Sequence, residues 1–420
     1  SSIIIVSLFI IIFYLKEIKF KKDLLINIFY IYIFVQFFSF ILIRDIKIEY
    51  DQFYFLLNQF LIIFFFHITI SLKEMMPEKL IIINKLFFYI LIFFILFVVG
   101  MLSLELYPEF FKTKQHSFYY GYFVSPGSLF LEQQVPRVTG ISRLILVLII
   151  FSMINLLYSN FKFLSFLTSS ALISMLFLTD SRFSFYCFFI LSAILFIFDK
   201  NFSLQKKIIY FLSVIIFSIL INQSLIFVKE NSVISKKLLE KQKIEALQSA
   251  PPLYENKRST WVEARIESIQ QNKTDVLERD SRLTQDFSTS GRKQDWIAFF
   301  KFIKQKPIIG YGFQADRFLI RKPASSAYIY SFVSGGIIGL LLFTSIVILS
   351  LYMSMKIIFF DKIFEKKSNI IVKASILINI MIIIRCIIEN SISVYNFDLI
   401  MFLLTFTIIS FYEKNIKKHS

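Results

Sequence analysis

Long apolar blocks alternate with short polar connectors along almost the whole chain. The blocks are continuous runs of Ile, Leu and Phe, and many reach the roughly 17 to 25 residues that cross the hydrocarbon core of a membrane. Since only helices or closed barrels satisfy their backbone hydrogen bonds in lipid, these continuous blocks are predicted to be helices. The candidate spans are residues 2–15, 24–43, 53–72, 81–106, 141–158, 163–179, 183–198, 208–228, 327–352, 370–388 and 397–412.

This pattern predicts an all-α polytopic integral membrane protein with about 11 to 12 transmembrane helices and one large loop. We expect N-terminal transmembrane helices in residues 1–228, with a loop near 107–140. Residues 229–326 should form the large loop, and residues 327–420 the C-terminal transmembrane helices and a cytoplasmic tail. Inside the large loop, "SVISKKLLEKQKIEALQS" and "RSTWVEARIESIQQN" have helical spacing and predict short amphipathic helices, for which a structural lid is one interpretation.

Basic connectors indicate which ends of the spans face the cytoplasm. "KEIKFKKD", "DKNFSLQKK", "KIIFFDKIFEKK" and the tail "EKNIKKHS" belong inside by the positive-inside rule, which places the large loop outside. These connectors also account for the net charge of +17, so no nucleic-acid partner is expected. The chain opens with Ser1, and an even number of spans with both ends inside would need one more helix before it.

The amino-acid composition limits the class of protein and the kinds of functional site that the chain can form. The chain is 56% hydrophobic with 54 Phe, which exceeds what a soluble domain can cover with polar groups. The two cysteines, Cys187 and Cys386, each lie inside an apolar block, and the three histidines are far apart in the sequence. We therefore expect neither a disulfide framework nor a metal held by Cys or His.

The stretch "STSGRKQDWIAFFKFIKQKPIIGYGF" is amphipathic and predicts a helix that begins near Arg292 and ends before Pro307. Ser288, Thr289 and Ser290 are candidate caps, and apolar residues at helical spacing follow: Trp296, Phe299, Phe300 and Ile303. The helix dipole opposes a cation in the first turn, whereas the free amides there attract anions. An anion such as phosphate would satisfy both. The alternative is an ordinary solvated arginine.

Other arginines reach the same predicted face of the membrane. Arg137 precedes a span, Arg182 lies in the short turn "TDSR", and Arg385 ends a span four residues before Glu389. An ionisable pair at that depth is costly unless it faces a partner or a wet cavity, although a structural salt bridge is the alternative. Four guanidinium groups near one surface repel each other without anions among them. A lipid-linked diphosphate would supply those anions.

Two glycine-containing segments follow the amphipathic stretch. In "IIGYGFQADRF", Gly310 and Gly312 permit tight turns, and Asp316 and Arg317 follow them. Because no strand precedes and no helix follows in the required pattern, a dinucleotide site is rejected. In the next span, the glycines of "SGGIIGLLLF" are predicted to allow close helix packing.

Taken in order, "PRVTG", "LTDSR", "SGRKQDW", "KPIIGYGF", "SSAYIYSFVSGGIIGLLLF" and "RCIIENSISVYNFDLIMF" resemble the bacterial O-antigen polymerases and O-antigen ligases. The resemblance covers about residues 137–405 and implies a large periplasmic loop. It implies a metal-independent glycosyltransferase without cofactor, acting on undecaprenyl-diphosphate-linked oligosaccharide at the periplasmic face of the bacterial cytoplasmic (inner) membrane. Its partners would be this substrate, membrane lipid and, as a candidate, a chain-length regulator protein.

The resemblance implies that Arg137, Arg182, Arg292 and Arg385 are the functional arginines of the outer loops. The expected diphosphate-binding residues are these four and Arg317. The catalytic candidates are Arg292 and Arg182, with Glu389 and Asp316 as candidate bases for the acceptor hydroxyl and Asp295 behind them. No residue is assigned to a metal.

One departure from the family pattern bears on the choice within it. Ligases usually carry a His, commonly followed by Asn, shortly before the glycine-rich span, whereas "RKPASSAYIYSFVSGG" contains none. This favours an O-antigen polymerase of the Wzy type, or a polymerase of a related surface polysaccharide, over a ligase that transfers polymer to lipid A-core. A transporter or flippase of lipid-linked oligosaccharide is the alternative of another class.

Overall fold

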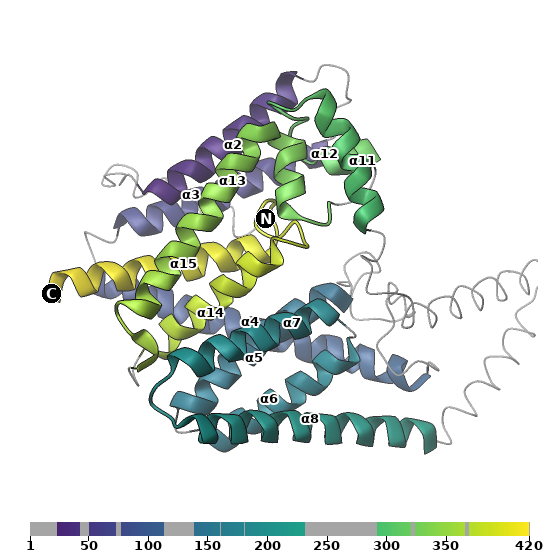
Figure 1. The fold of residues 1–420 in the computed structure, drawn as a ribbon, viewed down its shortest axis with the longest axis vertical. Helices are drawn as coiled ribbons and strands as arrows, with labels where there is room; N and C mark the ends of the chain where they lie inside the picture. Colours follow the sequence, from purple (N-terminus) through teal and green to yellow (C-terminus); the bar gives the residue numbers. More distant parts are fainter. Residues whose placement is uncertain are drawn as a thin grey trace, which may run out of the picture. The chain divides into compact units, whose positions relative to one another are not determined.

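The computed structural model describes residues 23–42, 50–72, 77–112, 138–159, 161–179, 181–231, 292–320, 324–365 and 369–419 (Figure 1). The elements are α2 (Leu24–Leu42), α3 (Tyr50–Leu72), α4 (Pro77–Lys112), α5 (Val138–Tyr158), α6 (Lys162–Leu178), α7 (Arg182–Phe198), α8 (Leu204–Asn231), α11 (Arg292–Gln305), α12 (Ala315–Ile320), α13 (Ala327–Phe359), the short 3-10 helix η1 (Ile363–Glu365), α14 (Ile370–Arg385) and α15 (Phe397–His419). No strand occurs in these residues.

The predicted all-α polytopic fold is confirmed. Each expected span that falls within the described residues coincides with a helix, and α14 ends three residues earlier than its expected span of 370–388. Among the described residues, six helices are long and apolar enough to cross a membrane, namely α2, α3, α4, α5, α8 and α13. Helices α6 and α7 are apolar but shorter. The expected span 2–15 and the two amphipathic helices of the large loop lie outside the described residues.

The chain divides into two compact units. One comprises Ser1–Ile226 with Trp296–Ser420, and the other comprises Phe227–Asp295. Within the first unit, α14 is central: all residues from Ile371 to Ile383 are buried, and the helix packs against α5, α7, α13 and α15. In contrast, α4 and α8 expose many Ile, Leu and Phe side chains, as expected for helices that face lipid.

Helix α13 is broken within its apolar sequence. Gly336 has φ 60° and ψ −157°, so the helical hydrogen-bond ladder is interrupted there. The segment 307–312 fills the gap with its own backbone: Tyr311 N–H donates to Val333 C=O and Gly312 N–H to Ser334 C=O, both at 2.8 Å. On the other side of the break, Ile337 N–H donates to the C=O of Pro307 at 2.8 Å. Buried backbone groups in lipid need such partners, so loop and helix complete each other.

The glycines of these segments are required by that arrangement. Gly310 and Gly312 have φ of 75° and 86°, which confirms the predicted tight turns. At Gly336, however, close helix packing is not the main reason for glycine, because the positive φ and the approach of the Ile308 carbonyl exclude any Cβ atom. A Cβ at Gly339 would lie 2.7 Å from the carbonyl oxygen of Ser331, on the other side of the same break.

Helix α2 holds the broken region through a stripe of polar side chains. Tyr32 Oη lies 2.8 Å from Ser331 Oγ, and the Ser39 hydroxyl donates to the Ile309 carbonyl at 2.6 Å. Between them, the Gln36 amide donates to Ser334 Oγ at 3.2 Å. Tyr32, Gln36 and Ser39 of this otherwise apolar helix therefore all contact the broken region, and they help to fix the loop that carries Asp316.

Candidate functional site

The candidate site begins at the C-terminal end of α14, where Arg385 is buried in the protein with its side chain only 1% exposed. Its Nη2 contacts Glu389 Oε2, and its Nε lies 3.5 Å from Asp398 Oδ2 in the first turn of α15. The predicted pairing of Arg385 with Glu389 is therefore present. The structure adds a second, fully buried carboxylate that bonds the same guanidinium group.

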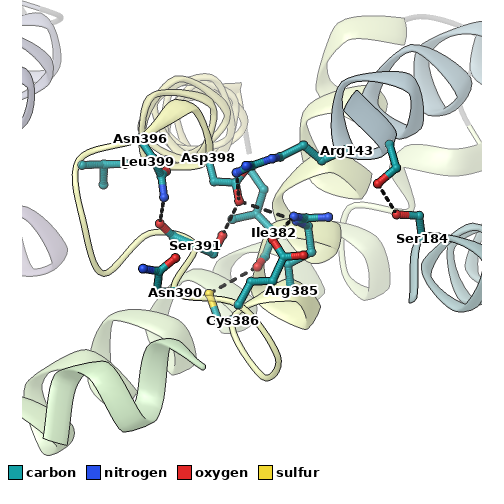
Figure 2. A network of polar contacts seen from close by, with 12 residues as sticks. Arg143, Ser184, Ile382, Arg385, Cys386, Asn390, Ser391, Asn396, Asp398 and Leu399 are labelled. Carbon is teal, nitrogen blue, oxygen red and sulfur yellow. Dashed lines mark hydrogen bonds and ion pairs between the residues drawn. The ribbon is translucent and has the colours of Figure 1, made fainter. Parts of the chain in front are cut away.

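Asp398 is the centre of this network (Figure 2). Besides Arg385, its Oδ2 accepts a hydrogen bond of 2.8 Å from the Ser391 hydroxyl and lies 3.4 Å from Nη1 of Arg143, which reaches across from α5. The Asp398 side chain is 2% exposed and that of Arg143 is 27% exposed. One carboxylate thus joins α5, α14, α15 and the loop between the last two helices. We call Arg143, Arg385, Glu389 and Asp398 the arginine–carboxylate network.

The loop 386–396 between α14 and α15 is ordered by its own polar side chains. Asn396 accepts the N–H of Leu399 at 3.0 Å, as an N-cap does, and its amide donates to the Ser391 carbonyl (Figure 2). Ser393 Oγ donates to the Asn390 carbonyl at 2.8 Å. The "ENSISVYNF" sequence therefore forms a fixed turn that presents Ser391 to Asp398.

The N-terminal end of α7 lies beside the same network. Ser184 donates to Ser142 Oγ at 3.0 Å, next to Arg143 in the chain, and it also contacts Ser181 Oγ at 2.9 Å. Arg182 is the first residue of α7, and its side chain is exposed. The helices that carry Arg143 and Arg182 therefore start at one end of the bundle, beside the end of α14.

Asp316 and Arg317 lie at a narrow cleft of about 30 Å³ at this end of the bundle. The residues that line the cleft are Phe55, Phe313, Gln314, Asp316, Arg317, Asn390, Val394 and Tyr395. Arg317 is exposed, whereas Asp316 is buried. The cleft thus brings the "IGYGFQADR" segment next to Asn390, which follows Glu389 in the chain.

The Asp316 carboxylate is held by backbone donors on both oxygens. Ala324 N–H donates to Oδ2 at 2.7 Å, and Arg317 N–H donates to Oδ1 at 3.0 Å. Burial raises the pKa of Asp316 to about 6, although these hydrogen bonds and the charge of Arg317 act in the opposite direction. Asp316 therefore closes its own loop and is less available as a base than a free carboxylate would be.

Two predicted residues are placed only in part. Arg292 is the first residue of α11, as predicted, but its side chain lies outside the described set, as does the whole of Arg137. The predicted amphipathic pattern of α11 holds for Phe299 and Ile303, which are buried against Tyr311 and its neighbours. Phe300, in contrast, is 45% exposed.

Sequence reasoning missed Arg143 and Asp398. Each is a single charged residue within an expected span, in "ISRLILVLII" and "NFDLIMFLL". An ionisable residue inside an apolar segment is costly without a partner, and this signal could have indicated both. What the sequence did not provide was the pairing, because the two residues are 255 positions apart.

A second polar cluster, at the opposite ends of the same helices, provides a contrast. Asn201 and Tyr158 both donate to the Phe364 carbonyl, at 2.8 and 3.1 Å, and Lys207 Nζ donates to the Phe196 carbonyl at 2.9 Å. These side chains cap helix ends and connect loops. Unlike the arginine–carboxylate network, this cluster lies among the basic connectors for which the sequence predicts a cytoplasmic location.

Among the described residues, no group of three or more His, Cys, Asp or Glu side chains could hold a metal ion. The fold and the network together define a multi-pass α-helical membrane protein with ionisable side chains fixed at one end of its helices. Residues 164–344, from α6 to α13, match the family model of the O-antigen ligases. This match is consistent with the O-antigen polymerase/ligase family, which the sequence motifs resemble.

The family match supports O-antigen polymerase or ligase activity in general, and members of the family are glycosyltransferase-like enzymes. Neither the curated proteins nor the solved structures that were compared include a match to this chain.

Proposed function

We propose that the protein is an O-antigen polymerase, or a polymerase of a related surface polysaccharide. It transfers a growing glycan from undecaprenyl diphosphate onto a new lipid-linked repeat unit. The observation that carries this proposal is the arginine–carboxylate network, which fixes two guanidinium groups at the end of an apolar bundle. Residues 164–344 of this bundle match the family model, and the network residues lie on either side of that match. Guanidinium groups suit a diphosphate because their planar donors match its oxygens.

The chemistry requires stabilisation of charge on the leaving group. As the bond between the sugar and the diphosphate breaks, negative charge builds on the diphosphate, and fixed cations lower the energy of that state. The donor arrives already activated, so the proposal needs no nucleotide. Glu389 is the preferred base for the acceptor hydroxyl, because its side chain is 26% exposed, whereas both oxygens of Asp316 accept backbone N–H groups.

The orientation of the site follows from the charges at the two ends of α7. Arg182 begins this helix, and the basic connector with Lys200 and Lys207 follows its end. By the positive-inside rule the connector is cytoplasmic, so we place the network at the periplasmic face of the bacterial inner membrane. Undecaprenyl-diphosphate-linked oligosaccharide, membrane lipid and a chain-length regulator protein remain the proposed partners.

The choice of a polymerase over a ligase rests on the sequence between α12 and α13. No His occurs in "RKPASSAYIYSFVSGG", where ligases usually carry one. The matching family model is described as O-antigen ligase, which favours the ligase as a second candidate. A ligase would transfer the polymer to lipid A-core, so the acceptor distinguishes the two.

Reconstitution tests the proposal. Purified protein in liposomes that contain lipid-linked repeat units should make polymer. Arg385→Ala should lower the rate about 10²- to 10³-fold, the typical effect of losing one fixed donor to a developing anion. Arg385→Lys should rescue poorly, because an ammonium group lacks the planar donors. Lys200→Ala is the matched control, since Lys200 is an exposed cation paired with Glu365 at the opposite end.

Each outcome has a clear meaning. Full-length polymer from Arg385→Ala at unchanged protein level removes the network from the mechanism. Translocation of repeat units without polymer identifies a flippase, and product on lipid A-core alone identifies a ligase. Arg182→Ala and Arg292→Ala should also shorten chains if the roles implied by the family resemblance hold.

A further inference from the structure

Arg385 is the member of the arginine–carboxylate network best suited to bind a diphosphate, but it is also the arginine least accessible to a ligand from outside. The Arg385 side chain is 1% exposed, and two carboxylates already bond its guanidinium group. Glu389 and Arg143 are the partly exposed members of the network, at 26% and 27%. A ligand that approaches from outside therefore meets Glu389 and Arg143 before Arg385.

Charge balance requires one carboxylate to leave when an anion binds. Arg143 and Arg385 carry two positive charges, and Glu389 and Asp398 carry two negative ones, so the network is neutral as it stands. A diphosphate that joined it without any rearrangement would leave buried negative charge unpaired, which is strongly unfavourable. The diphosphate can therefore bind Arg385 closely only if it replaces an existing anion.

The two carboxylates differ in how firmly they are held. Asp398 is 2% exposed, accepts the Ser391 hydroxyl and bonds both arginines from the first turn of α15. Glu389 follows the end of α14, and among the described residues Arg385 is its one side-chain partner. Glu389 can therefore rotate away into the exposed region, whereas Asp398 cannot leave without disrupting three helices.

We propose that the diphosphate of the lipid-linked donor displaces Glu389 from Arg385, and that the released Glu389 carboxylate then takes the proton of the acceptor hydroxyl. This inference rests on the proposed function and adds an order of events to it. Asp398 keeps Arg385 and Arg143 in place throughout. Binding of the donor thus creates the base, and without a donor Glu389 stays neutralised by its arginine.

The transfer step balances. The proton of the acceptor O–H moves to a Glu389 oxygen, and the acceptor oxygen forms a bond with the anomeric carbon of the donor sugar. The bond between that carbon and the diphosphate oxygen breaks, and its electron pair leaves with polyprenyl diphosphate, whose added negative charge Arg385 and Arg143 stabilise. Glu389 then returns its proton to water and pairs again with Arg385 when the diphosphate departs.

The test separates binding from transfer in one variant. Geranylgeranyl diphosphate, which carries no sugar, serves as the binding probe for the purified full-length protein in detergent. Glu389→Gln removes the competing anion and should bind the probe about tenfold more tightly, which corresponds to about 1.4 kcal/mol. The same variant should lose transfer about 10²-fold or more, because a base is missing. Glu365→Gln, at the opposite end, should change neither quantity.

The other results overturn the inference. Equal or weaker binding of the probe by Glu389→Gln shows that Glu389 does not compete for Arg385, and full transfer by this variant shows that it is not the base. If Glu389→Gln does not fold, Glu389→Asp answers the same question. Its carboxylate is one methylene shorter, so it should hold Arg385 less closely, bind the probe more tightly and retain part of the transfer activity. Unchanged probe binding by Glu389→Asp overturns the inference.

Failure of the proposed function gives a different pattern. If the wild-type protein does not bind the probe and makes no polymer from lipid-linked repeat units, the function itself is wrong. If the wild-type protein does both and Glu389→Gln binds the probe no better, only the displacement of Glu389 is wrong.

Discussion

Replacing Asp398 by Asn tests the arginine–carboxylate network most directly. Asn keeps the size of the side chain and an oxygen for the Ser391 hydroxyl, but it removes the charge that faces Arg385 and Arg143. At 3.5 Å and an effective dielectric constant of about 20, one such pair contributes about 5 kcal/mol of attraction. Much of this attraction is offset by the cost of burying the carboxylate, so we expect a net loss of about 3 kcal/mol when its charge is removed.

The assay is thermal unfolding of the purified protein in detergent, together with polymer length in cells. For about 3 kcal/mol in a chain of this size, the unfolding midpoint should fall by on the order of 5 °C. Polymer should shorten as well, because Arg385 loses the carboxylate that holds it in place. Asp361→Asn is the matched control, since Asp361 is a partly exposed aspartate just after α13 and should leave both measurements unchanged.

A double-mutant cycle makes the result decisive. If Asp398 acts through Arg385, adding Arg385→Gln to Asp398→Asn should cost less than the sum of the two single changes, with a coupling of about 0.5 to 3 kcal/mol. Additive losses would show that the two residues act independently. A wild-type midpoint and full-length polymer in Asp398→Asn would refute the assignment of Asp398 to the network.

Two further predictions concern Gly336, at the break in α13, and the buried carboxylate of Asp316. Gly336→Ala should destabilise the protein by about 2 kcal/mol or more, because the backbone there is strained for any other residue and a Cβ would strike the Ile308 carbonyl. Gly100→Ala is its control, with nothing within 4 Å of the added methyl group, and equal midpoints for the two variants would contradict the prediction. The second concerns pH: the pKa of Asp316 is raised from 3.8 to about 6, so the folded protein holds this proton more tightly than the unfolded chain. Stability from Asp316 should be greatest below about pH 4 and should decrease by about 3 kcal/mol as pH rises through 6. Midpoints measured from pH 4 to 7 should show this slope in the wild-type protein and not in Asp316→Asn, and parallel curves would contradict the assignment.

The fold could be predicted from the sequence because the lipid environment restricts which backbone structures are stable. A segment in hydrocarbon must satisfy its backbone internally, so an apolar block of sufficient length is a helix. This rule placed α2, α3, α5 and α7 to within a few residues, whereas α13 continues to Phe359, beyond the expected end at residue 352. It did not predict the break in α13, because the hydrogen-bond partners there come from residues 307–312, which lie before the helix in the chain.

The site could be predicted from the sequence only where its residues are neighbours in the chain. Arg385 and Glu389 were predicted to pair because they are four positions apart. Asp316 was predicted to be a candidate base for the acceptor hydroxyl, whereas its two backbone hydrogen bonds show that it closes a loop. Arg143 and Asp398 meet through the packing of both α5 and α15 against α14, which no local pattern encodes.

The inserted segment 307–312 has a consequence for how this part of the molecule can be altered. Because it supplies the backbone groups that α13 lacks, the chain from Pro307 to Ile337 must assemble as one piece, and neither part is complete without the other. An epitope tag or a length change between Gly312 and Ser326 would therefore disturb the part of α13 inside the bilayer as well as the loop at its surface.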